Sequence, residues 1–401
     1  MSSRTAVRFD AGARGPLDGL RVLDLSRLVA GNMLSLQLAD FGADVVKIEP
    51  PEGDPLRHWR DAGQELWWKV YGRNKRSVVL NLRQPAAREA LLRLVRKADV
   101  FIENYRPGTL EAMALGPDVL LEKNPDLIIV RISGFGQSGP YAPLPGFGTL
   151  VEAMSGVAAR TGFADREPVL PPFPLADMTA GLYGAFATMA ALRARDQGRT
   201  RGQVIDLALL EAMFSILGPE AAIYRHTGTL KERVGSASHT SAPRNVYRCA
   251  DGAHVALSAS TQAMARRVFE AIGRPEMIED ARFSTNSARI KHRALVDEAV
   301  GAWFAAKTRK EALARMRDAE VTVAPVYTIA DALVDAHFRE RELVPEVEDA
   351  ELGKIPMHAM VPRLSHTPGA WRMPAPRLGE HTDAVLAEAG LDADAIAALK
   401  H

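Results

Sequence analysis

The sequence predicts an α/β protein in which a large domain with an open parallel sheet is joined to a smaller α+β domain. Strand-like and helix-like segments alternate over the first 224 residues, and the pattern changes near residue 242. A chain of 401 residues also exceeds what one ordinary core holds. We therefore expect a large domain in residues 1–224, a linker in 225–241, a small domain in 242–335 and a return segment in 336–401.

The first domain begins with a strand–helix–strand unit of the doubly wound kind. Residues 20–25 and 44–48 have the apolar pattern of strands, and residues 32–41 between them have that of a helix. Further strands are expected at 77–82, 100–103, 127–132 and 203–207, and further helices at 88–97, 150–158, 178–192 and 209–224.

The second half of the chain begins with residues 225–241, which are polar, contain glycine and lack periodicity, as expected of a linker. Short strands are then expected at 245–247, 254–258 and 321–328, with helices at 262–272, 295–306 and 310–319. Residues 346–363 return to a β pattern, and residues 376–400 close the chain with a loop and two short helices.

The composition is that of a soluble globular protein, with 47% hydrophobic and 25% charged residues. Fifty Lys and Arg oppose 49 Asp and Glu, so no overall charge directs the protein to nucleic acid or membrane. Cys249 is the single cysteine, which excludes an intramolecular disulfide and fits a reducing compartment. The apolar runs are too short to span a bilayer, and residues 1–15 lack the core of a signal peptide. We expect a cytoplasmic protein.

Asp177 stands at the start of the expected helix 178–192, directly after the proline-rich segment 171–174. An aspartate in this place commonly caps the helix N-terminus. The same N-terminus also stabilises a charged, nucleophilic carboxylate. The helix is apolar and carries Gly181 and Gly184, which predicts a position at the edge of a buried region. The residues alone leave both roles open.

Residues 134–139 match the G-x-G-x-x-G pattern of dinucleotide-binding turns. Pro140 follows and prevents a helix from opening there, while the first strand–helix turn holds only Gly31. We therefore expect no nicotinamide cofactor, and we interpret these glycines as a flap or a close backbone approach to a ligand. No Cys, His, Asp and Glu set has the spacing of metal ligands.

Several arginines lie in or beside loops of the expected early sheet, where open α/β sheets bind ligands. A polyphosphate anion needs such a group of cations. The arginines in question are Arg57, Arg76, Arg83 and Arg106.

Six phrases in order resemble the class III coenzyme A transferase family, also called the CaiB/BaiF family. They are LDGLRVLDL at 17–25, ADVVKIE at 43–49, NKRS at 74–77, ENYRPG at 103–108, SGFGQSGP at 133–140 and LGEHT at 378–382. The resemblance covers nearly all of residues 17–390. It implies a Rossmann-like large domain built from both ends of the chain, a small domain between them, and an interlocked homodimer.

The resemblance also implies a reaction and a site. Coenzyme A would move from an acyl-CoA thioester to a small carboxylic acid, with no permanently bound cofactor and with Asp177 as the nucleophile. An anhydride and an aspartyl-CoA thioester would form on this residue. Gly31, Gly134 and Gly136 are the candidates for oxyanion donors or a flap. The residues expected to line the coenzyme site are Val29, Ala30, Arg57, Leu80, Arg83, Asn104, Tyr105, Arg106 and Phe147.

Three positions depart from the family pattern. Some relatives have glutamine where Val29 stands, a basic residue where Pro50 stands and arginine where Ala112 stands. Arg57 and Arg106 are the candidates to compensate, so the individual phosphate contacts stay open. The sequence also does not identify the donor and acceptor acids.

Other functions remain as alternatives. A 2-methylacyl-CoA racemase of the same family would need a histidine where Phe147 stands, and no histidine lies between His58 and His226. A non-catalytic acyl-CoA binding protein would keep the loops without requiring Asp177. A nicotinamide dehydrogenase would need the glycine-rich turn that the first strand lacks.

Overall fold

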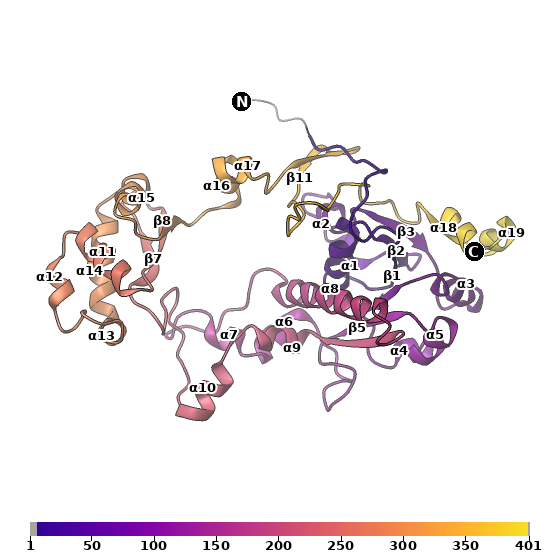
Figure 1. Ribbon diagram of the computed structural model, residues 1–401, viewed down its shortest axis with the longest axis horizontal. Helices are drawn as coiled ribbons and strands as arrows, with labels where there is room; N and C mark the ends of the chain where they lie inside the picture. The colour runs from indigo at the N-terminus through magenta and orange to yellow at the C-terminus, as the bar shows by residue number, and fades with distance from the viewer. Residues whose placement is uncertain (1–5, 400–401) are drawn as a thin grey trace. The chain divides into compact units, whose positions relative to one another are not determined.

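The computed structural model describes residues 6–399 and contains two compact units (Figure 1). The first unit comprises the chain up to Val157, Leu170–Gly218 and the chain from Arg341 onward. The second unit comprises Ala158–Val169 and Pro219–Glu340. Residues 158–169 thus lie in the second unit rather than in the large domain, and residues 225–241, expected as a linker, also belong to the second unit.

A parallel six-stranded sheet with the order β3-β2-β1-β4-β5-β6 forms the centre of the first unit. This is the order of Rossmann folds, in which the chain changes direction between β1 and β4. The predicted parallel α/β sheet is confirmed, although β3 begins and ends earlier than expected. The strands are β1 Arg21–Asp24, β2 Asp44–Glu49, β3 Lys75–Val79, β4 Val100–Glu103, β5 Ile128–Ser133 and β6 Gln203–Ala208.

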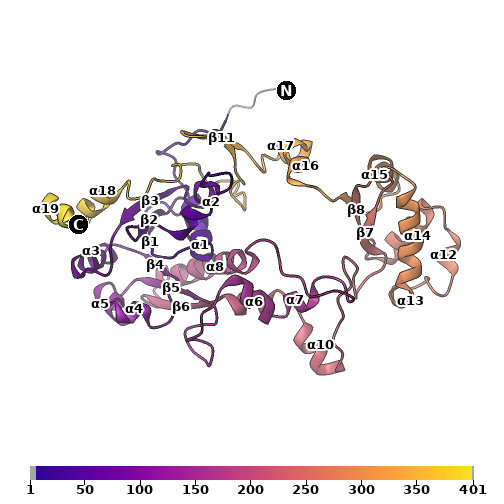
Figure 2. The same ribbon diagram turned by 180° about the vertical axis from the view of Figure 1, so that it is seen from behind.

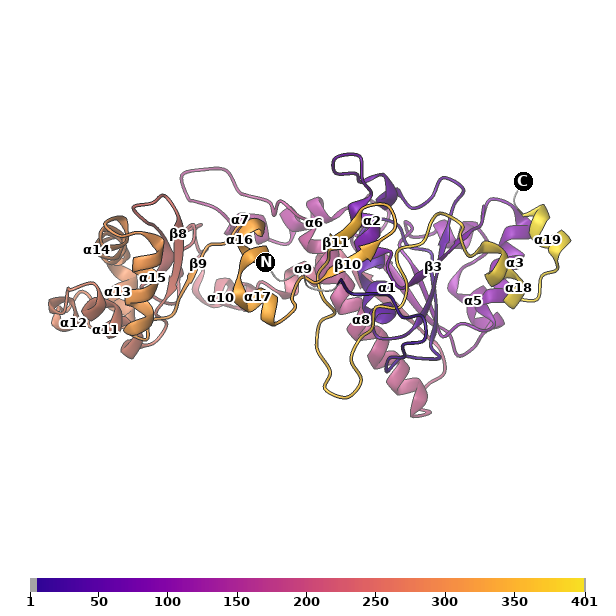
Figure 3. The same cartoon turned by 90° about the horizontal axis from the view of Figure 1, so that it is seen from above.

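Helices cover both faces of this sheet, because successive strand residues such as Val22 and Leu23 point into two different apolar clusters. One face packs against α1 Ala30–Asp40, α6 Gly148–Met154, α8 Leu175–Asp196 and α9 Leu209–Ser215. The other face packs against α3 Pro85–Val95, α5 Pro117–Lys123, α18 Thr382–Glu388 and α19 Ala393–Ala398. The end of the chain therefore lies beside α3 and α5, as Figures 2 and 3 show.

Helix α8 is longer than expected, with 22 residues, and begins at Leu175. Pro174 holds the N-cap position and Asp177 is the third helical residue, so the N-cap role considered for Asp177 is wrong. Gly181 and Gly184 let α8 approach Met33 and Leu34 of α1. By length and composition α8 would also be sufficient to cross a membrane, which corrects the expectation that every apolar run is too short; a core helix of a soluble protein passes the same test.

Smaller elements complete the first unit: η1 Pro55–His58, α2 Leu66–Tyr71, α4 Thr109–Ala112, β10 Glu346–Asp349 and β11 Gly353–Pro356. β10 and β11 form an antiparallel hairpin within the segment expected to have β character. Val347 and Ile355 of this hairpin pack with Leu66 and Val70 of α2, which attaches the return segment to the first unit.

The second unit contains an antiparallel sheet of β7 Arg244–Arg248, β8 His254–Ser258 and β9 Val323–Pro325. Its core lies between this sheet and helices that include α11, α14 and α15. The helix expected over 209–224 is interrupted, because Gly218 has a positive φ of 69° and Pro219 follows. The helices are α7 Val157–Arg160, which starts in the first unit, α10 Glu220–Thr227, α11 Gln262–Ala271, α12 Glu276–Glu279, α13 Asn286–Lys291, α14 Arg293–Ala305, α15 Arg309–Asp318, α16 Ile329–Val334 and α17 Ala336–Glu340.

Candidate active site

A cavity of about 340 Å³ opens at the carboxyl ends of β1, β4 and β5 in the first unit. In open α/β sheets this edge, where the strand order reverses, is the usual place for a ligand. Asp177 lies on its wall, together with charged, apolar and glycine residues from other parts of the chain. The lining residues are Arg27, Leu28, Ala30, Pro55, Asn104, Tyr105, Arg106, Pro107, Ile132, Ser133, Gly134, Phe135, Ala142, Leu144, Pro145, Gly146, Phe147, Asp177 and Leu209.

A second cavity of about 200 Å³ lies beyond the ends of β2 and β3 and shares Arg27 and Tyr105 with the first. The two cavities therefore form neighbouring parts of one extended site. The second cavity is lined by Arg27, Ile48, Glu49, Pro50, Pro51, Glu52, Leu80, Asn81, Leu82, Arg83, Tyr105 and Met113.

The Asp177 carboxylate lies between the start of α1 and the start of α6. Burial and, after it, the charge of Glu152 raise its pKa to about 6, while backbone hydrogen bonds from Asp177 itself and from Ala30 act in the opposite direction. Gly148 borders the same carboxylate, because a Cβ atom at this position would overlap Oδ2 of Asp177. This environment keeps Asp177 partly desolvated yet in contact with the cavity.

Two glycine-bearing segments meet backbone to backbone beside Asp177. A Cβ atom on Gly134 would lie 2.6 Å from Cα of Gly146, so neither position has room for a side chain. The segment from Gly134 to Phe147 contains no helix, which confirms that the G-x-G-x-x-G match does not open one.

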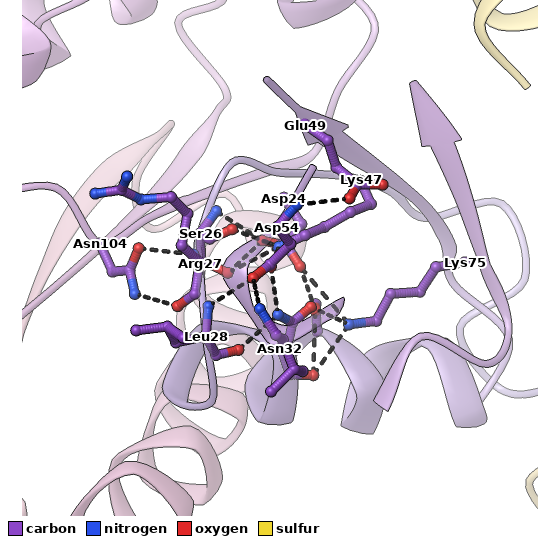
Figure 4. Close-up of polar contacts among 12 residues, drawn as sticks. Asp24, Ser26, Arg27, Leu28, Asn32, Lys47, Glu49, Asp54, Lys75 and Asn104 are labelled. Atoms are coloured by element: carbon purple, nitrogen blue, oxygen red, sulfur yellow. Dashed lines mark hydrogen bonds and ion pairs between the residues drawn. The ribbon is translucent and has the colours of Figure 1, made fainter. Parts of the chain in front are cut away.

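The turn after β1 is held by side chains at each of its backbone polar groups from Ser26 to Leu28 (Figure 4). Asn104 accepts a hydrogen bond from the Arg27 N–H at 2.8 Å and donates one to the Arg27 carbonyl at 2.7 Å. Asp54 accepts from the Leu28 N–H at 2.9 Å, and Asn32 donates to the Leu28 carbonyl at 2.6 Å. Leu28 has a positive φ of 62°, so these contacts stabilise an uncommon backbone conformation next to Ala30.

Two fully buried lysines lie beside this turn (Figure 4). Lys47 pairs with Asp54 at 3.0 Å and Asp24 at 3.3 Å, and it donates to the Ser26 carbonyl. Lys75 donates to Oδ1 of Asn32 at 2.9 Å, and burial lowers the pKa of its ammonium to about 7. The turn that lines the cavity thus depends on a buried charged network that the sequence did not indicate.

Nine of the expected site residues line one or other of the two cavities. Ala30, Asn104, Tyr105, Arg106, Gly134, Phe147 and Asp177 line the first cavity, whereas Leu80 and Arg83 line the second, together with Tyr105.

Four other expected residues lie outside both linings. Val29 is buried against Leu56 and Trp68. Arg57 is buried as well and pairs with Glu49 at 2.7 Å, so its guanidinium faces the interior. Gly31 packs on Ser26, and the Gly136 N–H donates to Ser133 Oγ at 3.0 Å.

The structure adds three residues that sequence reasoning missed. Arg27 lines both cavities, Gly148 borders Asp177, and Glu152 is buried next to the start of α8. The position of Arg27 directly after the first strand was an available signal. Nothing in the sequence indicated that Glu152 is buried, because an acid on a helix is usually exposed. Within residues 6–399 no group of three His, Cys, Asp or Glu has the arrangement of a metal site.

The family model of CoA-transferase family III matches residues 17–382. The chain is 40% identical to the succinyl-CoA–D-citramalate CoA-transferase of Chloroflexus aurantiacus, over 96% of this chain and 97% of that protein. It is 34% identical to the succinate–glutarate CoA-transferase of Agrobacterium fabrum, over 93% and 95% of the two chains. The crystal structure of a CaiB/BaiF family protein from Brucella suis aligns with a TM-score of 0.83 at 33% identity, over 94% and 100%. The chain therefore belongs to CoA-transferase family III and is a CoA-transferase.

Proposed function

We propose that the protein transfers coenzyme A from an acyl-CoA thioester to a free carboxylic acid, with Asp177 as the covalent nucleophile. One observation carries this proposal: the Asp177 carboxylate lies on the wall of the cavity at the strand ends, beside the backbone of Ala30. Partial desolvation makes a carboxylate a better nucleophile toward a bound thioester. Nearby amides are suited to the negative charge that develops on the attacked carbonyl oxygen.

The first half of the reaction acylates Asp177. A carboxylate oxygen of Asp177 attacks the thioester carbonyl carbon, a C–O bond forms, the C–S bond breaks, and coenzyme A leaves as its thiolate. The thiolate then attacks the aspartyl carbonyl carbon of the anhydride. A C–S bond forms there, the anhydride C–O bond breaks, and the donor acid leaves as a carboxylate.

The second half repeats these steps in reverse with the acceptor. The acceptor carboxylate attacks the aspartyl-CoA thioester and displaces the thiolate, which gives a new anhydride. The thiolate attacks the acceptor carbonyl of that anhydride, releasing the new acyl-CoA and free Asp177. No proton or electron is consumed over the cycle, because a carboxylate serves both as nucleophile and as leaving group from an anhydride.

The shape of the site suits an extended coenzyme. We place the thioester in the cavity that holds Asp177 and the phosphate-bearing part toward the cavity that holds Arg83. Arg27, which lines both cavities, and Arg106, which lines the first, complete the proposed phosphate-binding group. Arg57 no longer belongs to it, because its guanidinium is paired with Glu49.

The relatives suggest the class of acids. The Chloroflexus protein is named for succinyl-CoA and D-citramalate, and the Agrobacterium protein for succinate and glutarate. Each named acid carries two carboxyl groups. We therefore propose succinyl-CoA as the donor and a short dicarboxylic acid as the acceptor.

We further propose that the protein acts as a homodimer. Leu182, Phe186 and Met189 of α8 form an exposed apolar stripe, with Phe186 73% exposed. Such a stripe on a core helix marks a surface for another protein. A second copy of this chain is the proposed cover, and a reducing cytoplasm is the proposed compartment, since buried Cys249 is a free thiol.

The test is to trap the intermediate on Asp177. The protein is mixed with succinyl-CoA and hydroxylamine, digested, and analysed by mass spectrometry for a hydroxamate. We expect the modification on Asp177, and we expect an Asp177→Asn protein to lose both the modification and CoA transfer. Asp196→Asn, at the exposed far end of the same helix, is the matched control and should behave as the wild type. Normal CoA transfer by Asp177→Asn would refute the proposal.

A further inference from the structure

Glu152 of α6 is a buried carboxylate, only 3% exposed, that faces the start of α8. Its Oε1 accepts a hydrogen bond from the N–H of Ala176 at 3.0 Å. Within residues 6–399 it makes no ion pair with a Lys, Arg or His side chain. A buried carboxylate without a cation is costly to the folded state, so its presence beside the first turn of α8 calls for a physical role.

The same face of α6 touches Asp177. Gly148 lies four residues before Glu152, and positions four apart share one face of a helix. The Gly148 backbone borders Oδ2 of Asp177, while Glu152 binds the N–H of Ala176, the residue that precedes Asp177. Two carboxylates from different helices are therefore held in one partly desolvated region.

Few charges other than Glu152 lie near the Asp177 carboxylate. Asp40 of α1 is paired with Arg73 at 2.6 Å, and Tyr183 of α8 and Glu211 of α9 are exposed. The titratable and charged groups on the elements around Asp177, besides Glu152, are Asp40, Tyr183, Glu211, Arg193, Arg195 and Asp196 at the far end of α8, and, from the cavity wall, Arg27, Tyr105 and Arg106. Glu152 is the buried acid among them that adjoins Asp177.

We propose that Glu152 is a positioning residue that destabilises the free carboxylate of Asp177 relative to its acylated forms. This inference rests on the proposed function. Free Asp177 is negatively charged and is repelled by Glu152, whereas the aspartyl carbonyl of the anhydride or the CoA thioester carries no charge. Each acylation of Asp177 therefore relieves the repulsion, and each release of Asp177 restores it.

Two consequences follow for the reaction. The repulsion makes Asp177 a stronger nucleophile, because a carboxylate of higher basicity attacks a thioester more readily. It also raises the equilibrium fraction of enzyme that carries the aspartyl-CoA thioester. The direction of the Asp177 pKa agrees, since the charge of Glu152 is the largest cause after burial for its increase to about 6.

The experiment compares wild type with Glu152→Gln, which keeps an oxygen acceptor for the Ala176 N–H and removes the charge. We expect the pH midpoint of kcat/KM to move about one unit lower. The fraction of enzyme bearing the aspartyl-CoA thioester, measured by intact-protein mass spectrometry, should fall about tenfold at a fixed succinyl-CoA to succinate ratio. Glu122→Gln, which removes an exposed acid elsewhere in the first unit, should leave both readouts unchanged.

A second variant distinguishes the effect of the negative charge at residue 152 from the effect of the length of its side chain. Glu152→Asp keeps the negative charge on a shorter side chain, so its pH midpoint should stay near that of the wild type. If both variants weaken catalysis while the midpoint and the thioester fraction stay at wild-type values, Glu152 is merely structural and the inference is overturned. If hydroxamate forms on Asp177 but the pH midpoint of kcat/KM in Glu152→Gln is unshifted, only this inference fails. If Asp177→Asn transfers CoA normally, the proposed function itself fails.

A measurement on a folded enzyme guards against failure of Glu152→Gln to fold. Difference infrared titration of wild type against Asp177→Asn isolates the signal of the Asp177 carboxyl group. We expect this carboxyl group to titrate at about pH 6, above its ordinary pKa of 3.8. Titration of Asp177 at its ordinary pKa would overturn the inference.

Discussion

The backbone of Gly148 lies directly against the carboxylate of Asp177, with no room for a methyl group between them. This contact joins the first turn of α6 to the first turn of α8 at the cavity wall. The absence of a side chain at residue 148 is therefore a requirement of the nucleophile's position rather than of the helix that contains it.

We expect Gly148→Ala to lower kcat/KM by about 100-fold, because the added methyl group must displace the Asp177 carboxylate from its productive geometry. Steady-state kinetics with succinyl-CoA would measure this, with Tm as the check on folding. Gly301→Ala in α14 is the control, since its Cβ atom would meet Tyr247 only at 3.6 Å. A Gly148→Ala enzyme of wild-type activity would show that the contact is unimportant.

The pH dependence of activity should follow the ionisation of the Asp177 carboxyl group. Its pKa is raised to about 6, first by burial and then by Glu152, and only the ionised form attacks a thioester. We expect kcat/KM to rise about tenfold per pH unit below the midpoint and to level off above it. Rates at constant ionic strength test this, and a flat profile from about pH 5 to about pH 8 would contradict it.

The contribution of Asp177 to folding stability changes with pH in the opposite direction from its contribution to activity. Because its folded pKa lies above the ordinary value of 3.8, the folded state binds more protons than the unfolded chain between about pH 4 and about pH 6. The contribution is therefore present at low pH and is lost as pH rises through that window. We expect Asp177→Asn to remove this part of the pH dependence of the free energy of unfolding, as measured by urea unfolding between about pH 4 and about pH 6.

Arg83 and Arg106 should act on binding of the coenzyme. Replacing either arginine with glutamine should raise KM for succinyl-CoA about tenfold, since each removes a charge-assisted contact to phosphate, with a smaller effect on kcat. Arg14→Gln is the matched control, because Arg14 is exposed and pairs with Asp18. An unchanged KM in both site variants would remove these residues from the proposed phosphate-binding group.

Lys75 should make stability depend on pH. Burial lowers its pKa from 10.5 to about 7, so the unfolded chain binds more protons between these values and folding stability rises with pH there. Lys75→Met should flatten this rise, as measured from urea midpoints at about pH 7 and about pH 9. His358 and His381 do not compete in this window, because their pKa values are lowered from 6.5. Equal slopes in the two proteins would contradict the prediction.

The exposed stripe on α8 should hold the dimer together. Phe186→Glu places a charge on a side chain that is 73% exposed in the single chain, so the charge would be buried only if a second copy covers it. We expect the mass measured by light scattering to fall from that of a dimer to that of a monomer. Gln197→Glu, just past the end of α8, is the control. A wild-type protein that is monomeric would refute the proposed homodimer.

The local pattern of residues determined the elements of the sheet. All six strands were predicted, because a short apolar run between turn residues is a property of neighbouring positions. The resemblance of six short phrases identified the family and pointed to Asp177. The phrases at 17–25 and 43–49 cover β1 and β2, and those at 103–108 and 133–140 begin at the last residues of β4 and β5. The boundary of α8 was missed, because nothing local distinguishes Asp177 as a cap from Asp177 as the third helical residue.

The surroundings of Asp177 were decided only by the tertiary structure. Ala30 belongs to α1, whereas Gly148 and Glu152 belong to α6, and they reach Asp177 through the packing of α1 and α6 against α8. The same holds for Arg57, which looked free to bind a phosphate and instead pairs with Glu49, and for the two lysines buried beside the turn at Arg27. Burial and the field of neighbouring charges set what a titratable group does, and both depend on contacts between residues far apart in the chain.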